Sequence, residues 1–305
     1  MKPYGKFTGC WLGLVLLSLG GTFDRSTPAR SAALEPSEGN QEKTEAQEAT
    51  MRMARETLHL KFEGEVKPAQ AANFSGIGSE NLKFTRRLDS RTFISYNRRF
   101  SGADKSNLYR GENEDLLEKT RGVLSALGIP VAEVASEKVL LESTQVGHRD
   151  MNSGRVISEE AEKGKRYALV TRQINGLPVF SSRALIGLTG EGEIGFLEVH
   201  WPLVPAKVIE DARQFERIVR EGWHPPERPG ADVESITVGI IHSPAVGTAM
   251  DVYPTIRVIY APKDKRIGMK AVLDLNPEGN PVPVPRTFLE PPREDLKLQR
   301  ATPQP

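Results

Sequence analysis

The chain has 305 residues, of which 41 are Lys or Arg and 40 are Asp or Glu, and its formal net charge is +1 at pH 7. Proteins that bind nucleic acid usually present a concentrated basic surface, so this balance argues against a nucleic-acid partner. The length is enough for two domains and a sizeable hydrophobic core.

Residues 1–33 have the pattern of a signal peptide. A short basic region precedes an apolar run, Trp11 to Leu19, that is too short to span a bilayer. Cleavage after Gly20 or after Ala33 would release a secreted or periplasmic protein, whereas an uncleaved segment would anchor the chain in a membrane. The only cysteine, Cys10, precedes the apolar run, so we expect a mature chain without disulfides or a thiolate metal site.

Residues 34–57 are polar and of mixed charge. Such a composition cannot bury enough apolar surface to fold alone, which predicts a flexible linker or a frayed helix. Residues 58–112 alternate between apolar and polar types only in places, around 58–62 and again over 91–100. We therefore expect an N-terminal segment of irregular structure with short strands.

The clearest helix signal lies between Asn113 and Leu127. Its apolar positions recur at spacings of four, three and four residues, as on one face of a helix. Asn113 is suited to cap the start, and Gly128 can adopt the positive φ with which many helices end. The residues expected on the buried face are Leu116, Thr120, Val123 and Leu127.

A strand over 139–146 and then a meander of three strands are predicted after this helix. The meander strands are expected over Tyr167–Ile174, Leu177–Leu188 and Ile194–Trp201. Asn175-Gly176 separates the first two, and both residues tolerate the positive φ that a tight type I′ hairpin needs. Alternation gives the meander one apolar face, which another element must cover. That face consists of Ala184, Ile186, Leu188, Leu197, Val199 and Trp201.

The meander also resembles a known family. Tyr167 and Gln173, then Asn175-Gly176-Leu177-Pro178-Val179-Phe180, then a strand and Gly190-Glu191-Gly192-Glu193-Ile194, are similar to the FTP motif. FTP is the propeptide module of thermolysin- and fungalysin-type metallopeptidases and is related to PepSY domains. The family usually has Gly shortly after that Val, where this chain has Ser181-Ser182. The resemblance implies a cystatin-like unit, in which one helix covers a four-stranded antiparallel sheet.

The order of a helix followed by strands recurs in the second half of the chain. A second helix is predicted over Val208–Glu221, and three strands over 233–242, 252–260 and 269–275. The residues themselves do not repeat, so the alternative is two unrelated α+β domains. The predicted fold is α+β, with two tandem cystatin-like units at 113–204 and 205–276, each a helix packed on an antiparallel sheet. A proline-rich tail follows at 277–305.

The sequence shows no recognisable reaction centre. Its five histidines do not fall at ligand spacing on a predicted helix, and it contains no His-Glu-x-x-His metallopeptidase motif. A Gly-x-Ser-x-Gly nucleophile elbow is also missing from the sequence. We therefore expect a protein that is not an enzyme and needs neither a cofactor nor a metal. A hydrolase with an unrecognised site is the alternative.

The leading hypothesis is a secreted or periplasmic interaction module. By resemblance to stand-alone FTP/PepSY proteins, its partner would be a protein, in particular a secreted peptidase that it inhibits or helps to fold. An exposed strand face would present Arg172, Gln173, Arg183 and His200 to this partner. The alternative is an envelope-associated structural protein, held at a membrane by an uncleaved N-terminal segment.

Overall fold

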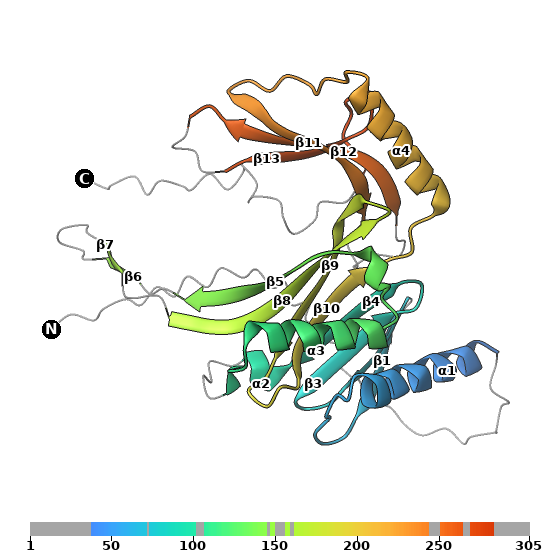
Figure 1. Ribbon diagram of the computed structural model, residues 1–305. Helices are drawn as coiled ribbons and strands as arrows, with labels where there is room; N and C mark the ends of the chain where they lie inside the picture. Colours follow the sequence, from blue (N-terminus) through green and yellow to red (C-terminus); the bar gives the residue numbers. More distant parts are fainter. Residues whose placement is uncertain are drawn as a thin grey trace, which may run out of the picture.

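The computed structural model describes residues 38–71, 73–101, 107–144, 147–149, 156–158, 162–243, 251–264 and 269–283. These residues form an α+β fold, with three long helices and a large mixed sheet that is mostly antiparallel (Figure 1). The predicted signal peptide and the tail from residue 284 onward lie outside the described residues.

The main sheet is built around strand β9, which pairs with more than one neighbour. Strands β1-β2-β3-β4-β10-β9 follow one another, while β9 also pairs with β8 and through it with β5; together they are termed the sheet body. The bounds are β1 (Lys67–Ala71), β2 (Phe74–Gly78), β3 (Leu82–Arg87), β4 (Arg91–Asn97), β5 (Val134–Thr144), β8 (Glu162–Ile174), β9 (Leu177–Leu188) and β10 (Ile194–Trp201). A separate hairpin consists of β6 (Gly147–Arg149) and β7 (Val156–Ser158).

Two of the long helices cover one face of the sheet body. Helix α1 (Glu38–Arg52) continues into the π-helical turn η1 (Met53–Thr57), and α3 (Asn113–Ala126) lies farther along the same face. Short helices α2 (Arg98–Ser101) and η3 (Val131–Glu133) belong to connections. The shared core contains Ala54, Leu58, Ile77, Phe84, Leu116, Leu124, Ile186 and Leu197.

The order of a helix followed by antiparallel strands occurs three times along the chain. Helix α1 precedes β1–β4, and α3 precedes β5, β8, β9 and β10. Helix α4 (Ala206–Arg220) precedes β11 (Ala231–His242), β12 (Val252–Pro262) and β13 (Ala271–Leu275), and this third group is termed the α4 lobe. The first two groups join through their last strands, β4 and β10, with Phe196 opposite Tyr96.

The first of these groups corrects the prediction for residues 34–57 and 58–112. The expected linker contains α1 and η1, whose Ala54 is fully buried, and Thr50 Oγ1 lies 2.7 Å from Ser75 Oγ of β2. The helix is stabilised by packing on the sheet and not by its own composition, which a sequence window cannot reveal. The next segment forms regular strands, but buried Ser75 and Ser95 on their core face blur the apolar alternation.

The central meander and its helix confirm the prediction closely. Strands β9 and β10 have the predicted bounds, and Asn175 and Gly176 have φ of 50° and 82°. Helix α3 buries the predicted side with Leu116, while Gly128 follows it with φ of 71°. The helix cap is Glu112 and not Asn113, whose Oδ1 accepts a hydrogen bond from Arg166 Nη1 instead.

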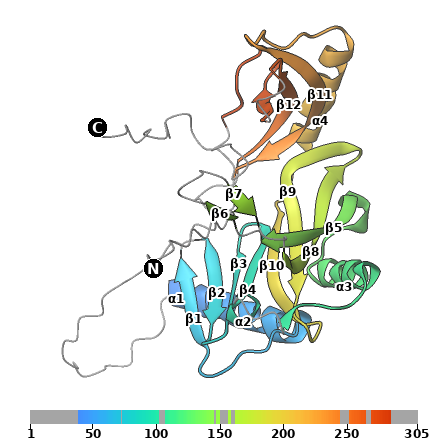
Figure 2. The same ribbon diagram turned by 90° about the vertical axis from the view of Figure 1, so that its left-hand side faces the viewer.

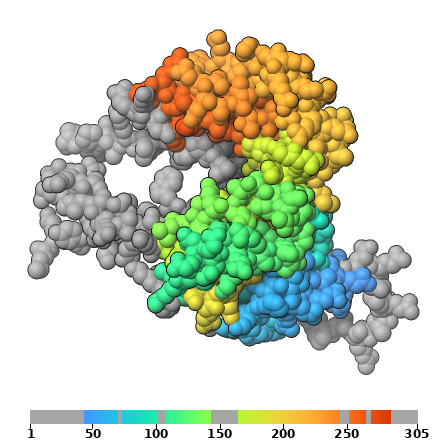
Figure 3. Space-filling view, viewed as in Figure 1, coloured from blue at the N-terminus to red at the C-terminus, as the bar shows by residue number. Residues whose placement is uncertain are grey.

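Helix α4 covers the sheet of its own lobe and also touches the sheet body. Its apolar side, formed by Val208, Ala212, Phe215 and Val219, packs on the lobe strands. Ala212 and Ile240 form one apolar cluster with Leu177 and Val179 of β9. In the space-filling view, the start of β9 lies between the two parts (Figure 3). The predicted boundary near residue 205 therefore separates elements that share a sheet, and independent folding of the two halves stays a prediction.

We expect Gly176→Val to lower the free energy of unfolding by about 1–3 kcal/mol, since a β-branched residue is strained at φ of 82°. No neighbouring atom crowds this position, so the cost comes from the backbone alone. Chemical denaturation of the purified protein measures it. Gly176→Asn is the matched control, because Asn tolerates the left-handed region, and equal stability of both variants would contradict the tight-turn assignment.

Candidate functional site

The predicted partner-binding residues lie on three adjacent strands, but they differ in accessibility. Arg183 of β9 stands directly opposite His200 of β10, and both are half-buried. Arg172 and Gln173 lie near the end of β8, where Gln173 is half-buried and Arg172 is only 3 % exposed. The structure thus brings Arg183 and His200 together and separates Arg172 from any exposed face.

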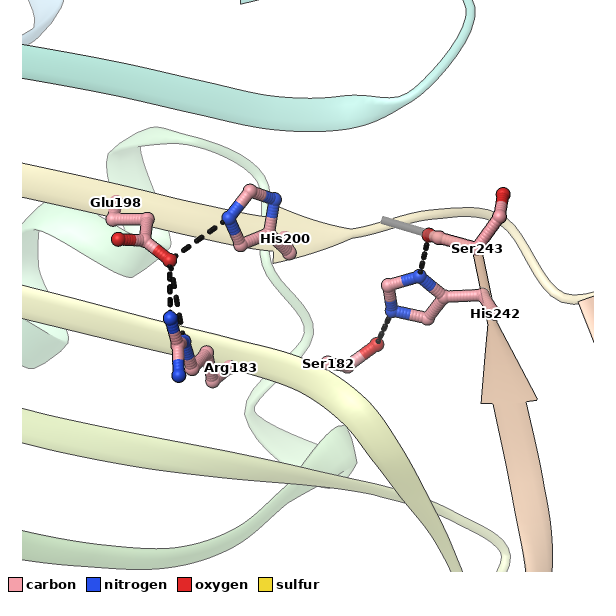
Figure 4. Close-up of polar contacts among 6 residues, drawn as sticks. All are labelled: Ser182, Arg183, Glu198, His200, His242 and Ser243. Atoms are coloured by element: carbon pink, nitrogen blue, oxygen red, sulfur yellow. Dashed lines mark hydrogen bonds and ion pairs between the residues drawn. The ribbon is translucent and has the colours of Figure 1, made fainter. Parts of the chain in front are cut away.

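Arg183 and His200 are held by a carboxylate that the sequence analysis did not single out. Glu198 Oε1 accepts hydrogen bonds from Arg183 Nη2 at 2.7 Å and lies 3.0 Å from His200 Nε2 (Figure 4). Burial alone would raise the pKa of Glu198, but the hydrogen bonds and charges of His200 and Arg183 outweigh it and lower the pKa to about 2. Glu198 and His200 are two residues apart on one predicted strand, which places their side chains on the same face. This spacing was the sequence signal that could have identified Glu198 as a partner of His200.

Next to this cluster, β9 contains three residues without a partner on β8. Thr171 pairs with Arg183, but the next residue, Arg172, pairs with Val179. Phe180, Ser181 and Ser182 therefore form a bulge. A bulge bends its strand and re-aims side chains, and here it directs them toward the α4 lobe.

The two serines of the bulge bind the end of β11. The His242 backbone N–H donates to Ser181 Oγ at 2.7 Å, and the His242 imidazole Nε2 lies 3.1 Å from Ser182 Oγ. The other ring nitrogen, Nδ1, lies 2.8 Å from the Ser243 carbonyl oxygen (Figure 4). Because a carbonyl can only accept, Nδ1 carries the proton and Nε2 accepts from the Ser182 hydroxyl.

Phe180 of the bulge contacts the α4 lobe through its ring. It lies against Gly239 of β11, where a Cβ atom would come within 2.6 Å of the ring and of the Pro178 carbonyl. The Arg257 guanidinium stands 3.8 Å from the ring centroid and is held by Asp274 through two hydrogen bonds. Bulge residues Phe180–Ser182 with His242, Gly239 and Arg172 are termed the joint.

Arg172 is a buried structural residue of this joint. Its guanidinium donates to the Pro202 carbonyl at 2.6 Å, to Ser182 Oγ at 3.3 Å and to Glu133 Oε2 at 2.8 Å. It also lies over the Trp201 ring, whose Nε1 donates to the same Glu133 oxygen at 2.8 Å. The prediction that Arg172 faces a partner is therefore wrong, because every side of its charge is occupied within the chain.

Ser182 and His242 have the relative placement of a nucleophile and its base, but not the access. Ser182 is 2 % exposed and His242 is 1 % exposed, and Ser182 Oγ already accepts from Arg172. A substrate carbonyl could not reach this hydroxyl without opening the joint. Burial lowers the pKa of His242 to about 4, against the opposing effect of its hydrogen bond to the Ser243 carbonyl, and the neighbouring His200 and Arg172 act in the same direction as burial. His242 is therefore neutral at pH 7.

Other features of the described chain are less specific. An open groove of about 970 Å³ at the β9–β10 turn is lined by polar side chains, including Asn81, Asn107 and Arg110, and by the Lys61–Glu193 ion pair. Within the described ranges, no group of three or more His, Cys, Asp or Glu residues could hold a metal ion. None of the described helices is long and apolar enough to cross a membrane.

Glu198→Gln should lower the free energy of unfolding at pH 7 by up to about 3 kcal/mol, the equivalent of a pKa that falls from 4.5 to about 2 on folding. A lowered carboxyl pKa stabilises the fold above about pH 4.5, and this contribution is lost as the pH falls toward 2. Urea denaturation between pH 7 and pH 2.5 should show the two proteins converging. Glu118→Gln on the exposed side of α3 is the control, and a pH-independent difference for Glu198→Gln would refute the assignment.

Solved structures include two with a similar arrangement. No protein-family model and no curated protein matches the chain. The Bacillus megaterium YpeB C-terminal domain is structurally similar with a TM-score of 0.31 and 10% sequence identity, over 75% of this chain and 92% of that one. An uncharacterized protein from Eubacterium rectale ATCC 33656 has a TM-score of 0.34 and 10% identity, over 80% of this chain and 81% of that one.

Proposed function

We propose that the chain consists of tandem helix-on-sheet units of the cystatin-like, FTP/PepSY kind and acts outside the cytoplasm as a non-enzymatic interaction module. Its partner is a secreted peptidase, which it inhibits or helps to fold. The observation that carries this proposal is the face of the sheet body opposite α1 and α3.

That face is open over most of its width among the described elements. Figure 2 looks onto these strands with α1 behind β1 and β2. Of the described helices, only the short α2 packs on this face, where Phe100 meets Tyr167 edge-on with ring centroids 5.7 Å apart. A sheet face that presents side chains without a covering layer is a surface on which a partner can dock.

Strand register places rows of apolar side chains next to charged ones on this face. One row combines half-exposed aromatic rings with an exposed leucine, and the next combines aliphatic residues with Glu198. The first row contains Leu140, Tyr167, Phe196 and Tyr96, and the second contains Leu169, Leu185, Glu198 and Ile94. Arg183 and His200 flank Glu198 on the same face. Apolar surface bordered by charged side chains that already have hydrogen-bond partners is typical of a protein–protein interface.

The choice of a peptidase as partner rests on the FTP-like sequence of the β8–β9 hairpin. Asn175 and Gly176 occupy the tight turn that this motif encodes. Arg183 and His200 remain the predicted residues that supply polar contacts at the edge of the docking surface, together with Gln173 at the hairpin end.

A photo-crosslinking side chain at Leu185, in the middle of the free face, should capture one peptidase when the protein is produced in its native host. The same group at Glu118, on the exposed side of α3, is the matched control and should not capture the peptidase that Leu185 captures. With the purified partner, Leu185→Asp should weaken binding about tenfold or more, whereas Glu118→Lys should change it less than about twofold. Capture of the peptidase from Glu118 alone, or of none from either position, would contradict the proposal.

A further inference from the structure

The joint contains a buried histidine that faces neutral and positive groups. His242 ends β11, which meets β9 at one paired position, Ile240 opposite Val179. Both its backbone N–H and its ring are bound to the bulge, through Ser181 and Ser182. One of the bonds that attach this strand end to the sheet body, the one from Ser182, therefore has His242 Nε2 as its acceptor.

The charged groups around His242 come from several elements. Arg172 on β8 and His200 on β10 both act on it, and both disfavour a second positive charge. The carboxylates that bind these two groups have partners of their own: Glu133 accepts from Arg172 and Trp201, and Glu198 accepts from Arg183 and lies against His200. An imidazolium at this position would thus be buried without a compensating anion in contact.

We propose that protonation of His242 releases the end of β11 from the β9 bulge, so that the α4 lobe turns away from the sheet body in mildly acidic solution. A protonated ring would carry a hydrogen on Nε2 that points at the Ser182 oxygen. That oxygen already accepts from Arg172 Nη1 at 3.3 Å, so its hydroxyl hydrogen would have to turn away from both donors. Opening the joint lets water solvate the imidazolium.

The sign of the effect follows from the direction of the pKa change. Because burial lowers the pKa of His242 from 6.5 to about 4, the closed joint is fully favoured above about pH 6.5 and loses this advantage as the pH falls to 4. The equilibrium between closed and open joints should shift toward open on the order of 100-fold over this range. The apolar cluster of Leu177, Val179, Ala212 and Ile240 contains no titrating group, so the lobe stays tethered and hinges.

Double electron–electron resonance, which measures the distance between two spin labels, tests this proposed opening on the full chain. With Cys10→Ser, labels at Glu118→Cys on α3 and Gln214→Cys on α4 report the position of the lobe. Labels at Glu118→Cys and Lys83→Cys, both within the sheet body, report whether the body itself stays intact. Between pH 7.5 and pH 4.5 the first pair should shift or broaden reversibly, while the second stays constant.

His242→Gln keeps a polar side chain that cannot be protonated, so its first-pair distances should be the same at both pH values. His224→Gln, outside the joint, should behave like the wild type. The proposal fails if the wild-type distances do not change down to pH 4, if His242→Gln changes as the wild type does, or if both label pairs change together. Should His242→Gln not fold, the two wild-type label pairs decide the question alone.

Discussion

Burial of the Arg172 guanidinium is the constraint on which the arrangement of this protein depends. A buried charge is costly unless every donor finds an acceptor, and a missing partner leaves the full penalty behind. The acceptors come from Glu133 before β5, Ser182 in the β9 bulge and the Pro202 carbonyl after β10. One side chain therefore fixes the relative positions of three segments that are far apart in the sequence, including the one that leads into α4.

The same region shows how environment gives two histidines different roles. His200 shares its carboxylate partner Glu198 with Arg183, so a positive ring there meets a compensating charge. His242 has a serine on one ring nitrogen and a carbonyl on the other. His200 therefore lies against a carboxylate, whereas a proton on His242 would place a buried charge against Ser182 with no carboxylate in contact. This difference makes His242 the element through which pH can act on the joint.

The sequence predicted local features well and long-range ones poorly. Strands β9 and β10 were predicted to the residue, because their alternation and the Asn175-Gly176 turn are local signals. A frayed helix was one of two predictions for the segment that contains α1, but its packing was missed because its burial comes from contact with β2, which no window around it contains. Arg172 was misplaced because it has the same parity on β8 as the buried Ala168 and Val170, so strand alternation places its side chain on the covered face. Ser181-Ser182, noted as a departure from the family's usual Gly, turn out to be the residues that bind β11.

The way the third helix-and-strand group is attached explains why the joint is polar. The first two groups share an extended antiparallel ladder between β4 and β10, and its register fixes their relative orientation. The α4 lobe lacks such a ladder, since β11 and β9 meet at a single parallel position. The apolar cluster around Ala212 and Ile240 favours association, but apolar contacts are non-directional. Directional hydrogen bonds between His242 and the two serines, Ser181 and Ser182, together with the stacking of Arg257 on Phe180, supply the orientation that burial alone would leave open.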